Sequence, residues 1–180
     1  MVYRFLLLSD EADNFKREIQ ISSQATFLDF HKEILKVTGY DENQIYSFFI
    51  CGDDWSKQME VTLIEMDTSS EEDNYVMEDT LLEELLEEEQ QKLLYVFDQL
   101  HERVFFIELR EIITGKDLKD PVCTKSVGEP PKQLIDFDIT ANDISADLGE
   151  NFYGDDAYDD EDLAGLDEGS FEEPATDDRF

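Results

Sequence analysis

The sequence has few cysteines and few basic residues, and each shortage argues against a class of protein. Its two cysteines, Cys51 and Cys123, lie far apart and outside any CxxC spacing, which argues against a disulfide framework and a zinc site. The 14 Lys and Arg residues stand against 47 Asp and Glu, giving a formal charge of -33. This charge argues against wrapping a nucleic-acid backbone, which requires clustered Lys and Arg, and the same sign disfavours acidic lipid surfaces. We therefore expect neither direct nucleic-acid binding nor membrane binding.

Long hydrophobic runs are missing as well. The apolar stretch from Val2 to Leu8 is interrupted by Arg4 and followed by Ser9 and Asp10, so it is too short for a signal peptide or a spanning helix. Together with the scarce cysteines, this predicts a cytoplasmic protein. The 41% hydrophobic and 12% aromatic residues nevertheless suffice for a packed core. At 180 residues, the chain suits one domain with a tail left over.

The first part of the chain predicts a hairpin followed by a helix. Residues 2–8 and 15–21 have the composition of two strands joined by a polar turn. The helix begins at Thr26, where Asp29 can complete a capping box, and it ends at Gly39. Its apolar face consists of Phe27, Phe30, His31, Ile34 and Leu35.

Two further hairpins follow, separated by a second helix. Strands are expected over four ranges, 45–51, 59–64, 92–97 and 103–113. Thr80 with Glu83 resembles a second capping box, and the helix after it has an apolar stripe of Leu81, Leu82, Leu85 and Leu86. The order ββαββαββ predicts an α+β fold in which an antiparallel sheet carries both helices on one face.

The composition changes at three later segments. Residues 67–74 are polar and acidic, which predicts a flexible loop, and residues 115–133 contain three prolines, which predicts an ordered loop over the domain edge. Residues 134–180 carry 17 acidic side chains and one basic one, so they cannot bury enough surface to offset their chain entropy. We expect a folded domain over 1–133 and a disordered acidic tail over 134–180. Aromatic residues among the tail's acids are typical of segments that dock on partners, and a purely solubilising tail is the open alternative.

Seven short motifs occur in order between residues 3 and 132. They read FKR at 15–17, TFLDFH at 26–31, GYD at 39–41, FFI at 48–50, the leucine-rich 81–86, YVFD at 95–98 and VGEPP at 127–131. The ordered set resembles the plasmid ORF-three-like family, the pRiA-type plasmid ORF-like domain, some of whose members are called insertion-element passenger proteins of the TnpR group. The resemblance implies an α+β domain found in bacteria and archaea, often near mobile elements, with no established activity.

Two strings of that family have no counterpart in the chain. The residues from Gln99 to Phe105 stand where members usually carry FGDxWEH, and Gln44 and Tyr46 stand where members carry a histidine pair. The resolvase-style name of some members implies strand exchange, but no residue set in this sequence supports that chemistry.

Few residues are candidates for metal binding or nucleophilic catalysis. Asp53 and Asp54 could bind a divalent cation together with residues 67–73, although the spacing of an EF-hand is missing and a solvated turn is the simpler interpretation. Ser47, His31 and Asp29 could be combined into a Ser-His-Asp set, but the sequence has no nucleophile elbow to support it. We therefore assign no catalytic, cofactor-binding or metal-binding residue.

The histidines and cysteines each have a structural interpretation. His31 lies on the apolar face of the first helix, where a core histidine bonded to backbone is expected, and His101 is expected to be exposed in a hairpin turn. Cys51 lies near two aspartates, which should raise its thiol pKa, and Cys123 lies in a loop without an activating group.

Three functional hypotheses follow. The first is a non-enzymatic protein-interaction domain with an acidic tail, whose charge would suit a basic protein partner. The second is an acidic mimic of DNA, in which carboxylates of the second helix and the tail occupy a basic DNA-binding protein. The third is a metal-dependent or hydrolytic enzyme, which would need a bound metal or ligand. No cofactor is expected in the first two cases.

Overall fold

The computed structural model describes residues 1–64 and 75–135 of the chain. In chain order the described elements are β1 (Val2–Leu8), β2 (Lys16–Ser22), α1 (Phe27–Thr38), β3 (Ser47–Cys51), β4 (Lys57–Thr62), β5 (Tyr75–Val76), α2 (Leu82–Leu85), β6 (Lys92–Asp98), β7 (Arg103–Ile113) and β8 (Val122–Val127). The predicted loop over 67–74 lies outside the described residues, and so does nearly all of the predicted tail.

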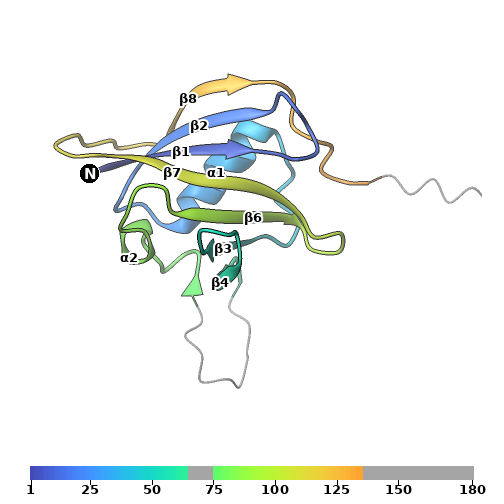
Figure 1. The fold of residues 1–180 in the computed structure, drawn as a ribbon, viewed down its shortest axis with the longest axis horizontal. Helices are drawn as coiled ribbons and strands as arrows, with labels where there is room; N and C mark the ends of the chain where they lie inside the picture. The colour runs from blue at the N-terminus through green and yellow to red at the C-terminus, as the bar shows by residue number, and fades with distance from the viewer. Residues whose placement is uncertain (65–74, 136–180) are drawn as a thin grey trace, which may run out of the picture. The chain divides into compact units, whose positions relative to one another are not determined.

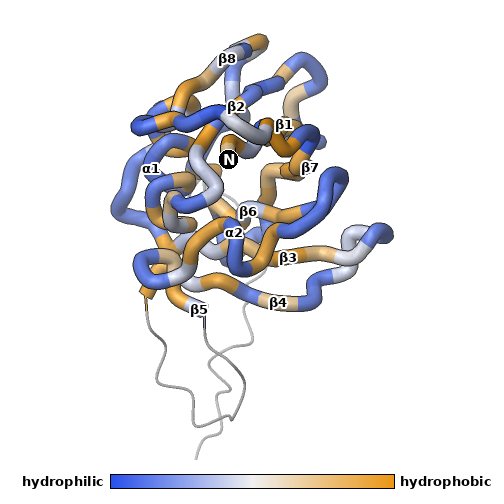
Figure 2. The backbone as a smooth tube through the Cα atoms, turned by 90° about the vertical axis from the view of Figure 1, so that its left-hand side faces the viewer, coloured by the Kyte–Doolittle hydropathy of each residue, from blue (hydrophilic) through white to orange (hydrophobic). Residues whose placement is uncertain are grey.

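The strands form one eight-stranded sheet in the order β5-β4-β3-β6-β7-β1-β2-β8. Helix α1 lies along one face of this sheet, behind β1, β7 and β6 in Figure 1 and beside the strands in the turned view of Figure 2. The predicted α+β class is confirmed. The sheet is mixed rather than purely antiparallel, because the two-residue strand β5 pairs with β4 in parallel.

The first helix forms as the local sequence predicts. The Thr26 hydroxyl accepts a hydrogen bond from the Asp29 amide, and the Asp29 carboxylate accepts one from the Thr26 amide. Gly39 ends the helix in the left-handed conformation, with φ of 71°. Phe30 then stacks on Phe5 of β1 and on Phe48 of β3, with ring centroids 4.5 and 5.5 Å apart, so this helix and the sheet share one aromatic core.

The second helix is shorter than predicted and lacks the predicted cap. Helix α2 has four residues, and Leu81 precedes it without any side-chain cap. The Glu83 carboxylate accepts a hydrogen bond of 2.7 Å from the Ser23 hydroxyl, so it is used in a long-range contact instead of a capping box. The predicted apolar stripe of leucines is present in part, because Leu82 and Leu86 are fully buried in the same core as α1.

The segment predicted as a loop over 115–133 contains a strand. Strand β8 pairs antiparallel with β2, and Lys125 lies opposite Glu18. Most of its residues are exposed because it is an edge strand, so it lacks the alternation of apolar and polar residues that would reveal it in the sequence.

The sheet face opposite α1 carries no helix in the described part of the chain (Figure 1). Apolar side chains nevertheless run across its middle strands, among them Leu94 and Val96 of β6, which are 7% and 2% exposed. The turn between β3 and β4 folds over this band, where the Trp55 ring meets Phe106 edge-on at 5.0 Å. We call this surface the open face.

Candidate functional site

Asp53 and Asp54, the two aspartates weighed as metal ligands, lie in a hydrogen-bonded turn. The Asp54 carboxylate accepts hydrogen bonds from the amide and hydroxyl of Ser56, which lower the pKa of that carboxyl. The Asp53 carbonyl accepts a hydrogen bond from the Lys92 ammonium. Over residues 1–64 and 75–135, no group of three or more His, Cys, Asp or Glu side chains is arranged to hold a metal ion. Residues 67–73, which were weighed together with the two aspartates, lie outside the described residues.

His31 is a core residue, but its partner is not the backbone that we expected. Its Nδ1 shares a hydrogen bond of 2.7 Å with the hydroxyl of Tyr95, and its residue surface is 3% exposed. Burial, helped by the charge of Lys32, lowers the pKa of His31 to about 4. The imidazole is therefore neutral at pH 7 and lies inside a cluster of rings with Tyr46 and Tyr95.

The remaining histidine and the two cysteines lie apart from one another. His101 lies in the β6–β7 turn as predicted, where its Nδ1 is 2.8 Å from the Asp98 carboxylate. Burial raises the pKa of the Cys51 thiol, so the predicted direction is right although burial is the leading cause. Cys123 lies on strand β8 rather than in a loop.

The structure does not assemble the Ser-His-Asp set. The Ser47 hydroxyl accepts a hydrogen bond from the Gln99 side chain, and His31 bonds to Tyr95. The Asp29 carboxylate is used in the cap at the start of α1. Each of these groups bonds to a different neighbour, so the three do not form the nucleophile–base–carboxylate chain of hydrogen bonds that a triad requires.

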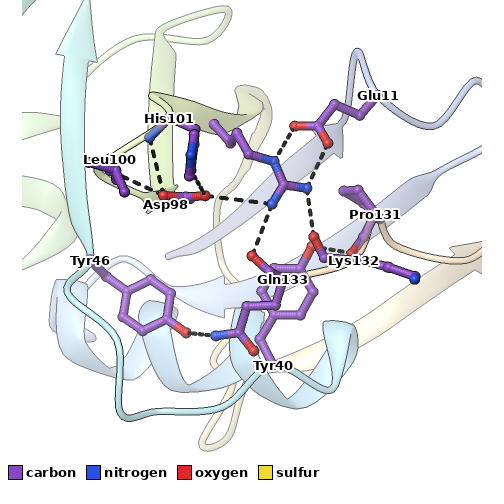
Figure 3. A network of polar contacts seen from close by, with 10 residues as sticks. Glu11, Tyr40, Tyr46, Asp98, Leu100, His101, Pro131, Lys132 and Gln133 are labelled. Atoms are coloured by element: carbon purple, nitrogen blue, oxygen red, sulfur yellow. Dashed lines mark hydrogen bonds and ion pairs between the residues drawn. The ribbon is translucent and has the colours of Figure 1, made fainter. Parts of the chain in front are cut away.

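The densest polar network of the described residues is centred on Arg103, at the start of β7 (Figure 3). Its guanidinium donates two hydrogen bonds of 2.8 and 2.7 Å to the Glu11 carboxylate, and these bonds raise the pKa of Arg103. It donates two more, of 2.9 and 2.6 Å, to the carbonyls of Gln133 and Lys132. Arg103 thus ties the β1–β2 turn to the last described segment of the chain.

The same segment is held from the other side by two tyrosines. The Tyr40 hydroxyl donates to the carbonyl of Pro131 at 2.6 Å. The Gln133 amide donates 2.7 Å to the Tyr46 hydroxyl, and Tyr46 itself donates to the carbonyl of Asp41. Burial raises the pKa of Tyr46 to about 12, so it stays protonated at neutral pH. Residues 131–133 are therefore fixed against the segment between α1 and β3 and against the start of β7.

This network was not found from the sequence, although one signal was available. On β7, Arg103 lies on the same inward-facing side as Phe105, Ile107 and Leu109. A single arginine in such an apolar row predicts a buried guanidinium whose hydrogen bonds are all satisfied. Its carbonyl partners could not be anticipated, because they lie 29 and 30 residues further along the chain.

An apolar groove of about 500 Å³ lies where β3 begins and β4 ends. Ile45 and Ile64 both line it with 69% and 66% of their surface exposed, so two large apolar side chains are presented to solvent at one place. Glu60 is its one charged lining residue, and the full lining is Ile45, Tyr46, Ser47, Glu60, Thr62, Leu63, Ile64 and Gln99. We call this feature the Ile45 groove.

A second hollow, of about 340 Å³, lies on the open face over strands β7, β1, β2 and β8. It is lined by Arg4, Leu6, Lys16, Glu18, Arg110 and Lys125, so cations dominate it. We call it the basic pocket. Across the described residues, no helix is both long and apolar enough to span a membrane.

The fold defines an α+β domain, and the comparisons with known proteins give its family. A family model described as plasmid pRiA4b ORF-3-like protein matches residues 3–162, and the chain belongs to this family. The match confirms the resemblance seen over residues 3–132 and extends it by 30 residues, into the segment predicted as a tail.

Curated proteins gave no match to the chain. Among solved structures, the chain is similar to a protein of unknown function from Methanosarcina mazei Go1, with a TM-score of 0.54 and 20% identity over 69% of this chain and 68% of the other. That similarity supports the fold alone.

Proposed function

We propose that this chain is a non-enzymatic protein-binding domain whose Ile45 groove takes a basic segment of a partner protein. The observation that carries the proposal is the exposure of Ile45 and Ile64, at 69% and 66%, beside a groove of about 500 Å³. A groove of this size can hold one or two apolar side chains of a partner. Exposed apolar surface of this kind on an otherwise strongly charged chain is typical of an interaction site.

The charge of the chain supports a basic partner. No lysine or arginine lines the Ile45 groove, and Glu60 provides a carboxylate beside its apolar residues. The formal charge of -33 attracts a basic protein over long range and raises its association rate. The predicted acidic tail over 134–180 supplies a large share of this charge, because it contains 17 acidic residues and one basic one.

The non-enzymatic part of the proposal is supported by the environments of three side chains that could serve as a nucleophile or a general base. His31 is buried and neutral, Cys51 has a raised thiol pKa, and Ser47 is bonded to Gln99. None of the three has the activated environment that nucleophilic or acid–base catalysis requires. A cytoplasmic location and a link to mobile elements are further parts of this proposal, suggested by the scarce cysteines and by the family.

Mimicry of DNA is the second candidate, and the charge of -33 is the observation in its favour. The version that relies on the second helix has little support, because α2 has four residues and presents only Glu83 and Glu84. A mimic would lose a basic partner steeply with rising salt, and duplex DNA would compete for that partner. Binding through the groove would depend mainly on Ile45 and Ile64.

Co-purification from the source cells tests the proposal. The wild-type chain is compared with a variant carrying Ile45→Asp and Ile64→Asp, and with Val122→Asp as a control for an exposed apolar residue on β8. We expect the basic proteins retained by the wild type to be lost with the double variant and kept with the control. Equal retention by all three chains would contradict the proposed site.

A further inference from the structure

The basic pocket gathers cations in a domain that is otherwise acidic. Residues 1–64 and 75–135 contain 13 Lys and Arg against 25 Asp and Glu, yet four of those cations line this one hollow. They come from four adjacent strands, since Arg110 lies on β7, Arg4 on β1, Lys16 on β2 and Lys125 on β8. The sheet therefore brings together basic residues that lie far apart in the sequence.

The two arginines and the two lysines of the pocket differ in how their charge is used. Arg4 forms an ion pair with Glu111, and Arg110 Nε lies 3.3 Å from the Glu108 carboxylate. Neither Lys16 nor Lys125 has an ion pair within the part of the chain that the structure describes. The lysine side of the pocket is thus where an anion from outside can be accommodated.

The spacing of the two lysines favours an extended ligand. Lys125 lies directly opposite Glu18, which is two residues along β2 from Lys16. The two lysines are therefore diagonal neighbours, and the Cβ atoms of such a pair are typically somewhat less than about 7 to 8 Å apart. Alternate side chains of an extended peptide lie about 7 Å apart on one side. A peptide with acids at alternate positions matches this spacing better than a compact anion does.

We propose that the basic pocket binds an extended acidic segment of a partner protein, with alternate carboxylates on Lys16 and Lys125. Leu6 of β1, which also lines the pocket, gives the segment an apolar contact. This site is separate from the Ile45 groove, because its lining residues belong to β1, β2, β7 and β8 and the groove's do not.

The choice of an acidic partner rests on charge complementarity at short range. The Debye length is about 8 Å at physiological ionic strength, so a bound segment interacts with the pocket more strongly than with distant carboxylates. The net charge of -33 still slows the approach of any acidic chain at low salt. Binding is therefore expected to be best at moderate ionic strength and to fall at high salt, where the lysine contacts are screened as well.

The test uses the full-length chain and a fluorescein-labelled synthetic peptide of alternating aspartate and threonine, with an asparagine–threonine peptide as the neutral control. Fluorescence anisotropy measures the affinity for wild type, Lys16→Glu, Lys125→Glu and the double variant. Lys32→Glu, which makes the same charge change on α1 and on the other face of the sheet, is the matched control. We expect about tenfold weaker binding for the double variant, about threefold for each single one, and no change for Lys32→Glu.

Carbodiimide coupling, which joins lysines to contacting carboxylates, identifies the occupant by mass spectrometry. Links from Lys16 and Lys125 to the aspartate peptide support the proposal. It is overturned if the peptide does not bind, if the neutral peptide binds equally, or if Lys32→Glu weakens binding as much as Lys16→Glu. Links from the two lysines to residues 136–180 of the same chain that persist at saturating peptide would also overturn it, since the pocket would then have another occupant.

Discussion

Replacing Arg103 by methionine should destabilise the domain by about 3 kcal/mol. The guanidinium makes four hydrogen bonds, two to the Glu11 carboxylate and two to the carbonyls of Lys132 and Gln133. Its side chain is 9% exposed, and breaking a buried, bonded ion pair costs about 3 to 5 kcal/mol. The Glu11 side chain is 34% exposed and regains water in the variant, so the lower end of that range applies.

Urea unfolding of the full-length chain, followed by far-ultraviolet circular dichroism at pH 7, measures this loss. The midpoint of thermal unfolding should fall by roughly 6 to 12 °C. Arg110→Met is the matched control, because Arg110 lies on the same strand, is 50% exposed and has one ion pair at 3.3 Å. It should cost less than about 0.5 kcal/mol. If the two variants unfold within about 0.5 kcal/mol of each other, the structural role assigned to Arg103 is wrong.

Three further predictions concern the fold. Thr26→Ala should cost about 1 kcal/mol in urea unfolding by removing the α1 cap, and Thr26→Ser should cost little; equal losses would refute the capping role. Gly128→Ala should destabilise the chain more than Gly115→Ala, because both glycines have positive φ but only the first would bring a Cβ into the Asn14 carbonyl; the reverse order would contradict the close approach. Folding lowers the pKa of His31 from 6.5 to about 4, so between these pH values the unfolded chain binds a proton that the folded chain does not. The contribution of His31 to the free energy of unfolding is therefore fully present above pH 6.5 and should fall by up to ~3 kcal/mol towards pH 4. His31→Gln should flatten that part of the pH dependence, and an unchanged slope would exclude His31 as its source.

The elements whose signals are local were predictable from the sequence. Helix α1 was predicted with its cap at Thr26 and its end at Gly39, because both signals lie within a turn of the helix end that they define. Strand β7 was predicted at its exact bounds from its apolar composition. The family resemblance was also available, because its motifs lie in order along the chain.

The features that depend on distant partners were not predictable. Strand β8 forms because β2 offers an edge, and its own exposed residues carry little strand pattern. Glu83 bonds to Ser23, which lies 60 residues away, so its capping role was predicted wrongly. The Ile45 groove and the basic pocket each combine residues from several strands, and no single stretch of sequence contains either one.

The most direct test of the proposed function is an NMR titration of the isotope-labelled full-length chain with a short peptide in which leucines are flanked by lysines. Binding in the Ile45 groove predicts amide shifts at Ile45, Ser47, Thr62 and Ile64, and these shifts should vanish in the Ile45→Asp and Ile64→Asp double variant. Shifts confined to other surfaces, or shifts that the double variant leaves unchanged, would contradict the account.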